Sequence, residues 1–370
     1  MTTPAAPSPQ PGSFDQARRA WQEGRLADAE RLCLAILARE SRHWATYPLL
    51  VRVLLAQGRA ADADRLVNHV CAQVPNQPEV LLARALVLDR LGRAAEALAA
   101  LDRAADLRLF WREATDELDA LLARRADPTP RYQVAVITPT VGTRHLRQAV
   151  ASVATQTYPL VRHLVVVDGA AHRARVEAAL SEAGGKPADV VVLPETIGGG
   201  GFNGHRVYGA APYLVDARFV AFLDEDNWFD PDHLEAMMSR ITATGSTWGF
   251  TLRRIVDEDG KFLMDDACES LGPVPTWLDK TVNLVDANCY VLRRDVALET
   301  SLVWYRRAPD ETSPDIELCR RLLVDRPRFV ATGRPTVNYR LHGPRAAARA
   351  DFFRRGNRHK SMAGDARDPR

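Results

Sequence analysis

The chain changes its pattern of apolar and polar positions near residue 130. Beyond this point, short apolar runs rich in β-forming residues alternate with helical segments. Such a run is typical of a strand buried on both faces, as in a parallel sheet. The predicted strands are Val134–Thr140, Leu164–Val167, Val190–Leu193 and Phe219–Leu223, with helices over 144–155 and after Gly204. Strand–helix–strand alternation predicts an α/β domain built on a parallel sheet.

The first third of the chain repeats itself every 34 residues. Gly-Arg pairs at 24, 58 and 92 keep this period, and Ala29, Ala63 and Ala97 keep the same phase. This period, with a glycine turn between two helices, is the tetratricopeptide signature. The predicted helices are Asp15–Gln22, Ala27–Arg39, His43–Ala56, Ala61–Gln73, Pro78–Leu91 and Ala95–Leu107, with a closing helix over 111–125. We therefore expect an all-α tetratricopeptide-like solenoid over 14–125, rather than a non-repeating helical domain.

Three acids, Asp224, Glu225 and Asp226, follow the strand that begins at Phe219. Ligand sites in open α/β sheets lie beyond the carboxyl ends of the strands. In an extended chain Asp224 and Asp226 point to the same side, and their repulsion favours a bound cation with oxygen ligands, Mn²⁺ or Mg²⁺. The alternative is a solvated turn before a helix that opens at Asp230-Pro231 with an N-cap and a first-turn proline.

The motifs from residue 132 to 343, in this order and spacing, resemble those of family-2 glycosyltransferases with the GT-A fold. The resemblance implies an inverting, metal-dependent enzyme that uses a uridine or thymidine diphosphate sugar. On the donor side it implies that Thr138-Pro139-Thr140 borders the base and that Asp168 hydrogen-bonds the uracil ring. It implies that Arg206 lies near the diphosphate, that Asp224 holds the ribose or a metal-bound water, and that Asp226 binds the metal.

On the acceptor side, the segment from Asp286 to Cys289 resembles the one that lines the acceptor site. Asp315 matches the catalytic base, and His342 matches a residue that approaches the metal, although a structural histidine is nearly as plausible there. Two positions depart from the family pattern: Val167 replaces a second acid before Asp168, and Pro314 precedes the base. The second departure leaves other acids open as the base, namely Asp310, Glu311 and Glu317.

The segment from Gly199 to Gly204 satisfies G-x-G-x-x-G, and Asp224 lies about 20 residues beyond it, as in dinucleotide-binding folds. Five residues separate the preceding strand from these glycines, where a dinucleotide-binding turn is tight. That reading would also leave the other acids without roles. We therefore expect a loop that passes beneath the sugar nucleotide and brings Arg206 behind it.

Composition narrows the remaining choices. The 49 basic and 47 acidic residues give a net charge of +2, so no overall field favours nucleic acid or a membrane surface. The five cysteines are isolated, no apolar stretch approaches a transmembrane span, and residues 1–13 form a flexible leader without signal-peptide features. These features predict a cytoplasmic protein. Residues 126–131 are a predicted linker, and 344–370, with eight basic and three acidic residues, are a predicted disordered tail.

Two classes of function follow from this organisation. The first is an active hexosyltransferase whose acceptor is a glycan or protein, bound in part by the concave face of the helical repeats. The alternative is a catalytically silent repeat-adaptor protein that still binds a nucleotide sugar. The presence together of Asp168, Asp224, Asp226 and Asp315 favours an active enzyme. The repeats themselves serve either a partner or acceptor, or a scaffold or dimer contact.

Overall fold

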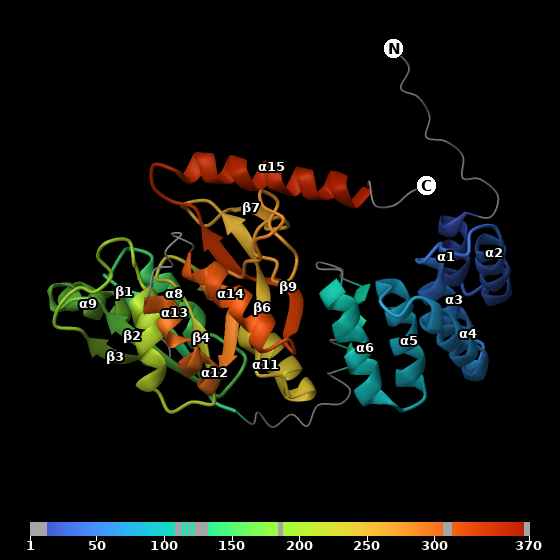
Figure 1. The fold of residues 1–370 in the computed structure, drawn as a ribbon, viewed down its shortest axis with the longest axis horizontal. Coiled ribbons are helices and arrows are strands. Elements are labelled where there is room, and N and C mark those ends of the chain that lie inside the picture. The colour runs from blue at the N-terminus through green and yellow to red at the C-terminus, as the bar shows by residue number, and fades with distance from the viewer. Residues whose placement is uncertain are drawn as a thin grey trace, which may run out of the picture. The chain divides into compact units, whose positions relative to one another are not determined.

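The computed structural model describes residues 13–107, 113–114, 116–117, 120–121, 132–183, 188–305 and 313–365. The chain divides into two compact units, residues 1–125 and 126–370 (Figure 1). Within the ranges just given, no helix is both long enough and apolar enough to cross a bilayer.

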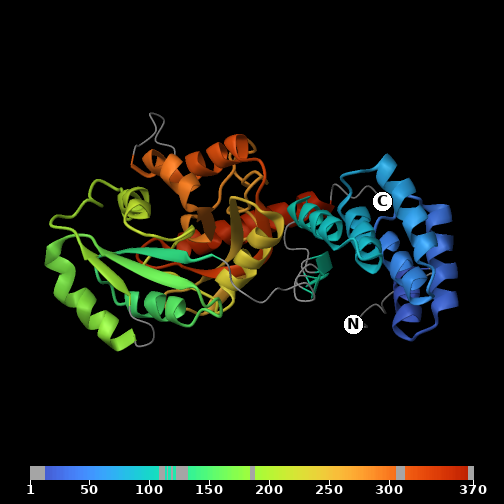
Figure 2. The ribbon, with the colours of Figure 1, turned by 90° about the horizontal axis from the view of Figure 1, so that it is seen from below.

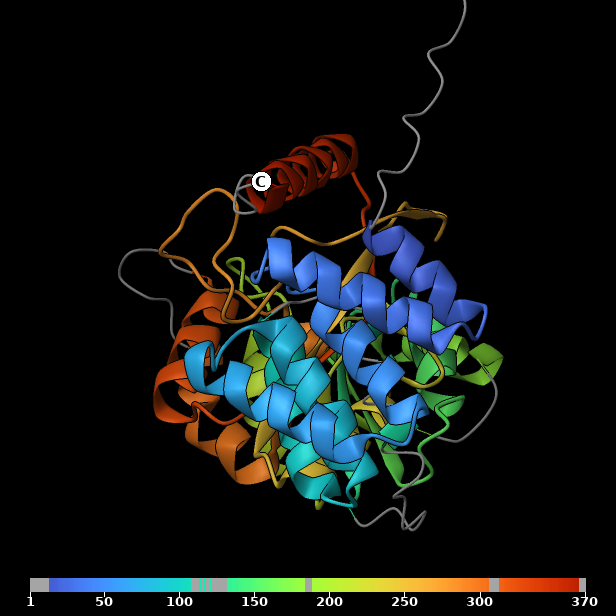
Figure 3. The same ribbon diagram turned by 90° about the vertical axis from the view of Figure 1, so that its right-hand side faces the viewer.

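The first unit is a stack of paired helices, seen from its end in Figure 3. Every helix predicted before residue 108 is present, with bounds that agree to within three residues. The observed helices are α1 (Phe14–Gln22), α2 (Leu26–Arg39), α3 (Thr46–Ala56), α4 (Ala60–Gln73), α5 (Pro78–Arg90) and α6 (Ala94–Leu107). The closing helix predicted over 111–125 lies largely outside the described residues.

Each repeat turns at its glycine. Gly24, Gly58 and Gly92 have φ of 73°, 77° and 75°, a left-handed conformation that glycine adopts without steric cost. In the first turn the N–H of Gly24 donates to Trp21 and that of Arg25 to Ala20. This pair of bonds satisfies the last carbonyls of α1. No atom lies within 4 Å of an added Cβ at these glycines, so the backbone angle, and not a shortage of space, requires glycine.

The phased alanines fill the closest approaches between paired helices. Ala29, Ala63 and Ala97 are all fully buried. A larger side chain at any of these positions would have to displace the neighbouring helix, because protein interiors leave few voids. The phase of small residues read from the sequence therefore corresponds to a packing requirement.

The second unit contains a single mixed sheet in its described part. Its order is β3-β2-β1-β4-β8-β6-β9-β5, with β7 paired to β6. Strands β1 to β4 are parallel, β8 is antiparallel to both β4 and β6, and β9 is parallel to β6. The strands are β1 (Val134–Thr140), β2 (Val161–Val167), β3 (Asp189–Val192), β4 (Phe219–Phe222), β5 (Trp228–Phe229), β6 (Trp248–Val256), β7 (Phe262–Asp265), β8 (Tyr290–Arg293) and β9 (Val330–Arg340).

Helices cover both faces of this sheet. In Figure 2 the green helices α8 and α9 lie on one face, and the yellow-green α10 and the orange α12 to α14 lie on the other. The helices are α8 (Leu146–Ala154), α9 (Arg173–Ala183), α10 (His205–Ala210), α11 (His233–Thr244), α12 (Arg294–Glu299), α13 (Ser301–Tyr305), α14 (Pro314–Asp325) and α15 (Ala346–Asp365). Burial on both faces explains why β1 and β4 are continuous apolar runs, since every residue of both strands is buried.

The prediction that a helix opens with Asp230 as N-cap and Pro231 in its first turn is wrong by two residues. Helix α11 begins at His233, and its N-cap is Asp232, whose side chain makes no cap hydrogen bond. The carboxylate of Asp230 is engaged elsewhere, because it accepts a hydrogen bond from Asn338 at 2.8 Å and pairs with Arg254 at 2.9 Å. These partners on β9 and β6 compete successfully with the helix terminus.

The prediction of a disordered tail over 344–370 is also wrong, because Ala346–Asp365 form helix α15. Phe353 is fully buried and packs with Ile255, Cys268 and Leu341. The helix also passes so close to Trp277 that a Cβ on Gly356 would lie 2.7 Å from its ring. A single apolar stripe therefore holds a helix that its charged composition disfavours. Residues 366–370 lie outside the described ranges.

Two buried histidines make the second unit sensitive to acid. Burial lowers the pKa of His163 to about 4 and that of His233 to about 3. The unfolded chain, with histidine pKa near 6.5, therefore takes up protons that the folded protein does not, and stability falls as the pH drops from about 6.5 toward 4.

Replacing His163 with glutamine removes one of these protonation sites while it keeps a polar atom near the Thr138 hydroxyl, which lies 2.9 Å from Nε2. We expect the free energy of unfolding of His163→Gln to fall less steeply with acid, by about 1.4 kcal/mol per pH unit between pH 6 and pH 4.5. Urea titrations followed by tryptophan fluorescence across this range measure the slope. Parallel pH profiles for the variant and the parent protein would contradict the assignment.

Candidate active site

The three acids that follow β4 take up three different positions. They lie in a turn, because the Asn227 N–H donates to the Asp224 carbonyl at 3.2 Å, and the extended conformation predicted for them is wrong. Glu225 turns toward β1, where it accepts hydrogen bonds from the Thr140 hydroxyl and from the Thr143 N–H at 2.8 Å. Since β1 and β4 are parallel neighbours, this bond joins their carboxyl ends.

Asp224 is held from both sides by polar side chains. One carboxylate oxygen accepts the Tyr208 hydroxyl at 2.6 Å, and the other accepts the Asn288 amide at 2.8 Å. Burial, followed by the charges of Asp226 and Asp286, raises the pKa of Asp224 to about 7. The hydrogen bonds from Tyr208 and Asn288 therefore do not fully offset the burial of Asp224 and the repulsion from its neighbouring carboxylates.

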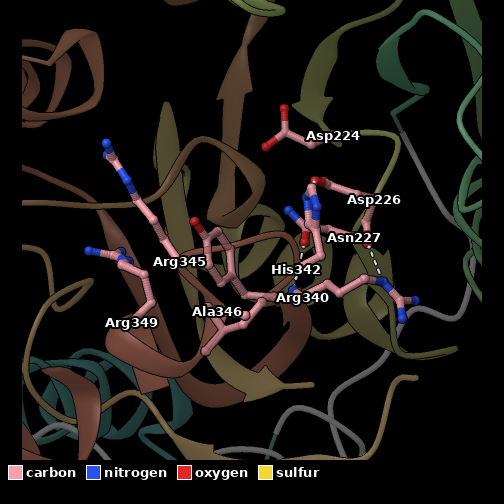
Figure 4. Close-up of a pocket in the computed structure, with 10 residues that line it drawn as sticks. Asp224, Asp226, Asn227, Arg340, His342, Arg345, Ala346 and Arg349 are labelled. Carbon is pink, nitrogen blue, oxygen red and sulfur yellow. Dashed lines mark hydrogen bonds and ion pairs between the residues drawn. The ribbon is translucent and has the colours of Figure 1, made fainter. Parts of the chain in front are cut away.

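Asp226 faces the histidine of the closing motif. His342 Nε2 lies 2.7 Å from Asp226 Oδ2, and Arg340 donates to the Asp226 carbonyl at 2.9 Å. Asp226 and His342 line a pocket of about 160 Å³, together with Asp224 (Figure 4). The remaining lining residues are Asn227, Tyr339, Arg340, Leu341, Arg345, Ala346 and Arg349.

The arrangement suits a cation that is bound partly by the protein and partly by substrate phosphates. Among the described residues, no three histidine, cysteine or acidic side chains form a metal cluster, so Asp224 does not join Asp226 and His342 in one. Magnesium is ordinarily bound by one or two carboxylates plus substrate phosphates, and Mn²⁺ accepts the same oxygen ligands. Asp226 with His342 therefore fits a substrate-completed site for either ion.

Asp315 lies in the first turn of α14, after the N-cap Ser313 and Pro314. Its Oδ1 is shielded from solvent and has no hydrogen-bond partner in the described part of the chain. Burial, and then the charges of Asp286 and Asp224, hold the pKa of this carboxyl well above its usual range. The carboxyl of Asp315 thus lies within electrostatic reach of Asp224.

Three other acids near Asp315 are alternative candidates for the base. Glu317 pairs with Arg320 at 2.7 Å on the outer side of α14. Asp310 and Glu311 lie outside the described residues. Of the two acids in the first turn of α14, Asp315 is the one with a buried carboxylate oxygen that lacks a hydrogen-bond partner among the described residues.

Asp168 fastens the glycine-rich loop. Its two carboxylate oxygens accept the N–H groups of Ile197 at 2.7 Å and Gly198 at 2.9 Å. A Cβ on Gly198 would lie 2.7 Å from the Asp168 carboxylate and 2.3 Å from the Asn203 carbonyl, so glycine permits this close approach. The role in base binding remains a prediction, and the structure adds a role in fixing the loop.

The threonine and proline of the first strand lie in packed surroundings. The buried hydroxyl of Thr138 contacts His163, inside the sheet, and Pro139 packs so closely on Gly204 that a Cβ there would lie 2.3 Å away. Thr140 contacts Glu225, as described above. All three residues are buried within β1, and their place beside the base stays a prediction.

Arg206 packs away from the pocket around Asp226. Its guanidinium stacks on Phe202, 3.7 Å from the ring centroid, and donates to the Ile197 carbonyl at 3.0 Å. Arg206 is not among the residues that line that pocket. The structure therefore joins Arg206 to the glycine-rich loop and does not bring it to Asp226.

Comparison with known proteins identifies the two units. Residues 135–299 match the family model for Glycosyl transferase family 2, and residues 20–87 match that for Tetratricopeptide repeat. The second unit carries a family 2 glycosyltransferase domain. The predicted fold class, a glycosyltransferase-type α/β domain preceded by tetratricopeptide-like repeats, is thereby confirmed.

Several solved structures are similar to the chain. Staphylococcus aureus TarS 1-349 has 16% identity, covers 59% of this chain and 63% of its own, and gives a TM-score of 0.43. For the complex of TarS 1-349 with UDP-GlcNAc, the identity is 16%, the match covers 58% of this chain and 61% of that chain, and the TM-score is 0.43. For the first TPR domain of human RPAP3, the identity is 16%, the match covers 29% of this chain and 84% of that domain, and the TM-score is 0.26. This chain thus spans less than two thirds of the TarS structures, and no curated protein matches it.

A buried arginine, missed at the level of sequence, organises the segments before β8 that carry Asp266, Glu269 and Asp286. Arg253, in the middle of β6, bonds Asp266 at 2.9 Å and also bonds Glu269 and Asp286. Asp286 in turn accepts the Asn288 amide, which holds Asp224. Asp286, which lies in the segment predicted to line the acceptor site, is therefore engaged in fixing Asn288 and Asp224. No local pattern announces such a cluster, since Arg253 is 13 to 33 residues from its partners.

We expect Arg253→Met to destabilise the glycosyltransferase domain by about 3–5 kcal/mol, because it leaves three carboxylates buried without their shared cation. The matched control is Arg254→Met, which removes a pair with Asp230 that is partly open to solvent and costs about 1 kcal/mol or less. Denaturant unfolding of both variants measures the difference. Equal, small losses would show that the Arg253 cluster does not stabilise the fold.

Proposed function

We propose that the protein is an inverting, metal-dependent glycosyltransferase that moves a sugar from a uridine or thymidine diphosphate donor to an acceptor hydroxyl. The observation that carries the proposal is the contact between Asp226 and His342 in a pocket that Asp224 also lines. The buried Oδ1 of Asp315, which has no hydrogen-bond partner among the described residues, is the candidate proton acceptor. A proton acceptor and a cation site then serve the two ends of one displacement.

Donor binding uses residues that the fold already fixes. Tyr208 and Asn288 orient the Asp224 carboxylate, which is available to a ribose hydroxyl. Asp226 and His342 would hold Mg²⁺ or Mn²⁺, which supplies charge neutralisation to the departing diphosphate. Asp168 keeps the glycine-rich loop close to the sheet edge where the nucleotide would lie.

Transfer requires a deprotonated base, so Asp315 must lose its own proton before it accepts one from the acceptor. An acceptor hydroxyl has a pKa far above neutral, so Asp315 takes its proton as the oxygen attacks the sugar carbon from the side opposite the leaving group. The raised pKa of Asp315 suits this task only when positive charge reaches the site, because burial, and then the charges of Asp286 and Asp224, favour its protonated form. Substrate binding and activation of the base are thereby linked.

The repeat unit is proposed to bind the acceptor, or a protein that presents it. Transfer to simple acceptors would then persist after deletion of residues 14–125, while transfer to the natural acceptor is lost. Solenoids of this type offer an extended concave surface suited to such a partner.

Asp226→Asn should abolish the metal-dependent part of UDP binding, because the amide cannot supply an anionic ligand. Calorimetry of UDP against the full chain, in Mn²⁺ and in EDTA, measures this. Asp232→Asn is the control, since that nearby acid pairs with Arg334 and does not line the pocket. If the parent protein binds UDP equally well in EDTA, the metal assignment fails.

Asp315→Asn should lower the rate of sugar transfer by about 10²–10⁴-fold with little change in donor affinity. The amide keeps the shape of the side chain but cannot accept the proton. Glu317→Gln on the outer side of α14 is the matched control and should retain the parent rate. A panel of UDP- and dTDP-sugars supplies the donors, and a parent protein that binds them without turnover would favour the silent adaptor.

A further inference from the structure

Helix α15 brings two arginines to the pocket that contains Asp226 and His342. Arg345 immediately precedes the helix and Arg349 lies one turn into it, and both line the pocket. Figure 4 shows them on the side opposite Asp226 and His342. Arg345 and Arg349 therefore lie across the pocket from Asp226, while Arg340 lies beside Asp226.

The arginines of this pocket differ in how far they are already engaged. Arg340 donates to the carbonyls of Asp226 and Glu258 and to the Gln148 side chain. Arg349 pairs with Glu269 at 3.4 Å and stacks on the ring of Phe353.

Arg345 stands apart from these two. Its guanidinium is exposed and has no side-chain partner among the residues that the structure describes. It is thus the cation of this pocket that has its hydrogen-bonding capacity available to a ligand.

The position of Arg345 matters because Arg206, the expected partner of the diphosphate, is engaged elsewhere. Arg206 stacks on Phe202 and lies 5.1 Å from the ring centroid of Tyr305, with one nitrogen bound to the Ile197 carbonyl. A diphosphate held near Asp226 would find its protein cation on α15 instead.

We propose that Arg345 binds the terminal phosphate of the nucleotide diphosphate, the phosphate from which the sugar departs. The inference rests on the proposed function. The planar guanidinium fork matches two phosphate oxygens, which a lysine ammonium does not. When the bond between the sugar carbon and the phosphate oxygen breaks, its electron pair stays on that oxygen, and Arg345 stabilises the added charge. The acceptor oxygen forms the new bond and its proton passes to Asp315.

An anionic group of the acceptor is the alternative ligand for Arg345. Measurements of nucleotide affinity distinguish this ligand from the terminal phosphate of the donor. Calorimetry of the full chain in Mn²⁺ compares UDP, which carries the terminal phosphate, with UMP, which lacks it. Arg345→Ala should weaken UDP binding by about 10- to 100-fold and leave UMP binding unchanged. Arg345→Lys should fall between the parent and the alanine variant.

The matched control is Arg354→Ala, an exposed arginine further along α15 that does not line the pocket. It should bind UDP as the parent does, and circular dichroism of each variant checks that the helix is retained. Unchanged UDP affinity in Arg345→Ala would overturn the inference, and if sugar transfer were then lost, Arg345 would serve the acceptor. A parent protein that binds neither nucleotide would instead overturn the proposed function itself.

Discussion

The arrangement of the site depends on the guanidinium of Arg253. This one buried cation holds Asp266, Glu269 and Asp286, so three carboxylates from two segments converge on the middle of β6. The group would be unstable if the arginine were its only compensation, because the cluster keeps an excess of negative charge. Backbone N–H groups supply the rest: Asp266 accepts three of them, from Cys268, Glu269 and Ser270. The irregular segment before β8 is thereby fixed without regular secondary structure.

Hydrogen bonds and ion pairs connect the Arg253 cluster to two sides of the pocket. On one side, Asp286 orients Asn288, which holds both the carboxylate and the backbone N–H of Asp224. On the other side, Glu269 also pairs with Arg349, which ties the start of α15 to the same cation. Asp224 and Arg349 are therefore positioned by one network, and a disturbance of Arg253 would reach both. This is the physical reason why the acids stay close together despite their repulsion.

What the sequence could predict follows from the range of the interactions. The repeats and the strands β1 to β4 depend on periods of 34 residues or on local apolar runs, and both were predicted closely. Asp226, His342 and Asp315 were found through the order of motifs, and the structure brings the first two into contact. The turn at Asp224, the role of Arg253 and the position of Arg206 depend on contacts between distant segments. Composition and spacing carry no signal for such contacts.

Helix α15 shows the same limit in its sharpest form. Its sequence has the charge of a disordered tail, and what orders it is the burial of Phe353 between β6 and the segment around Cys268. Because apolar packing places the helix, its arginines do not need ion pairs to stay in position. Arg349 nevertheless finds Glu269, whereas Arg345 reaches the pocket with its charge uncompensated by a described side chain. Asp226 and His342 would hold a cation that neutralises part of the charge of a diphosphate, and Arg345 would neutralise charge from the opposite side of the pocket.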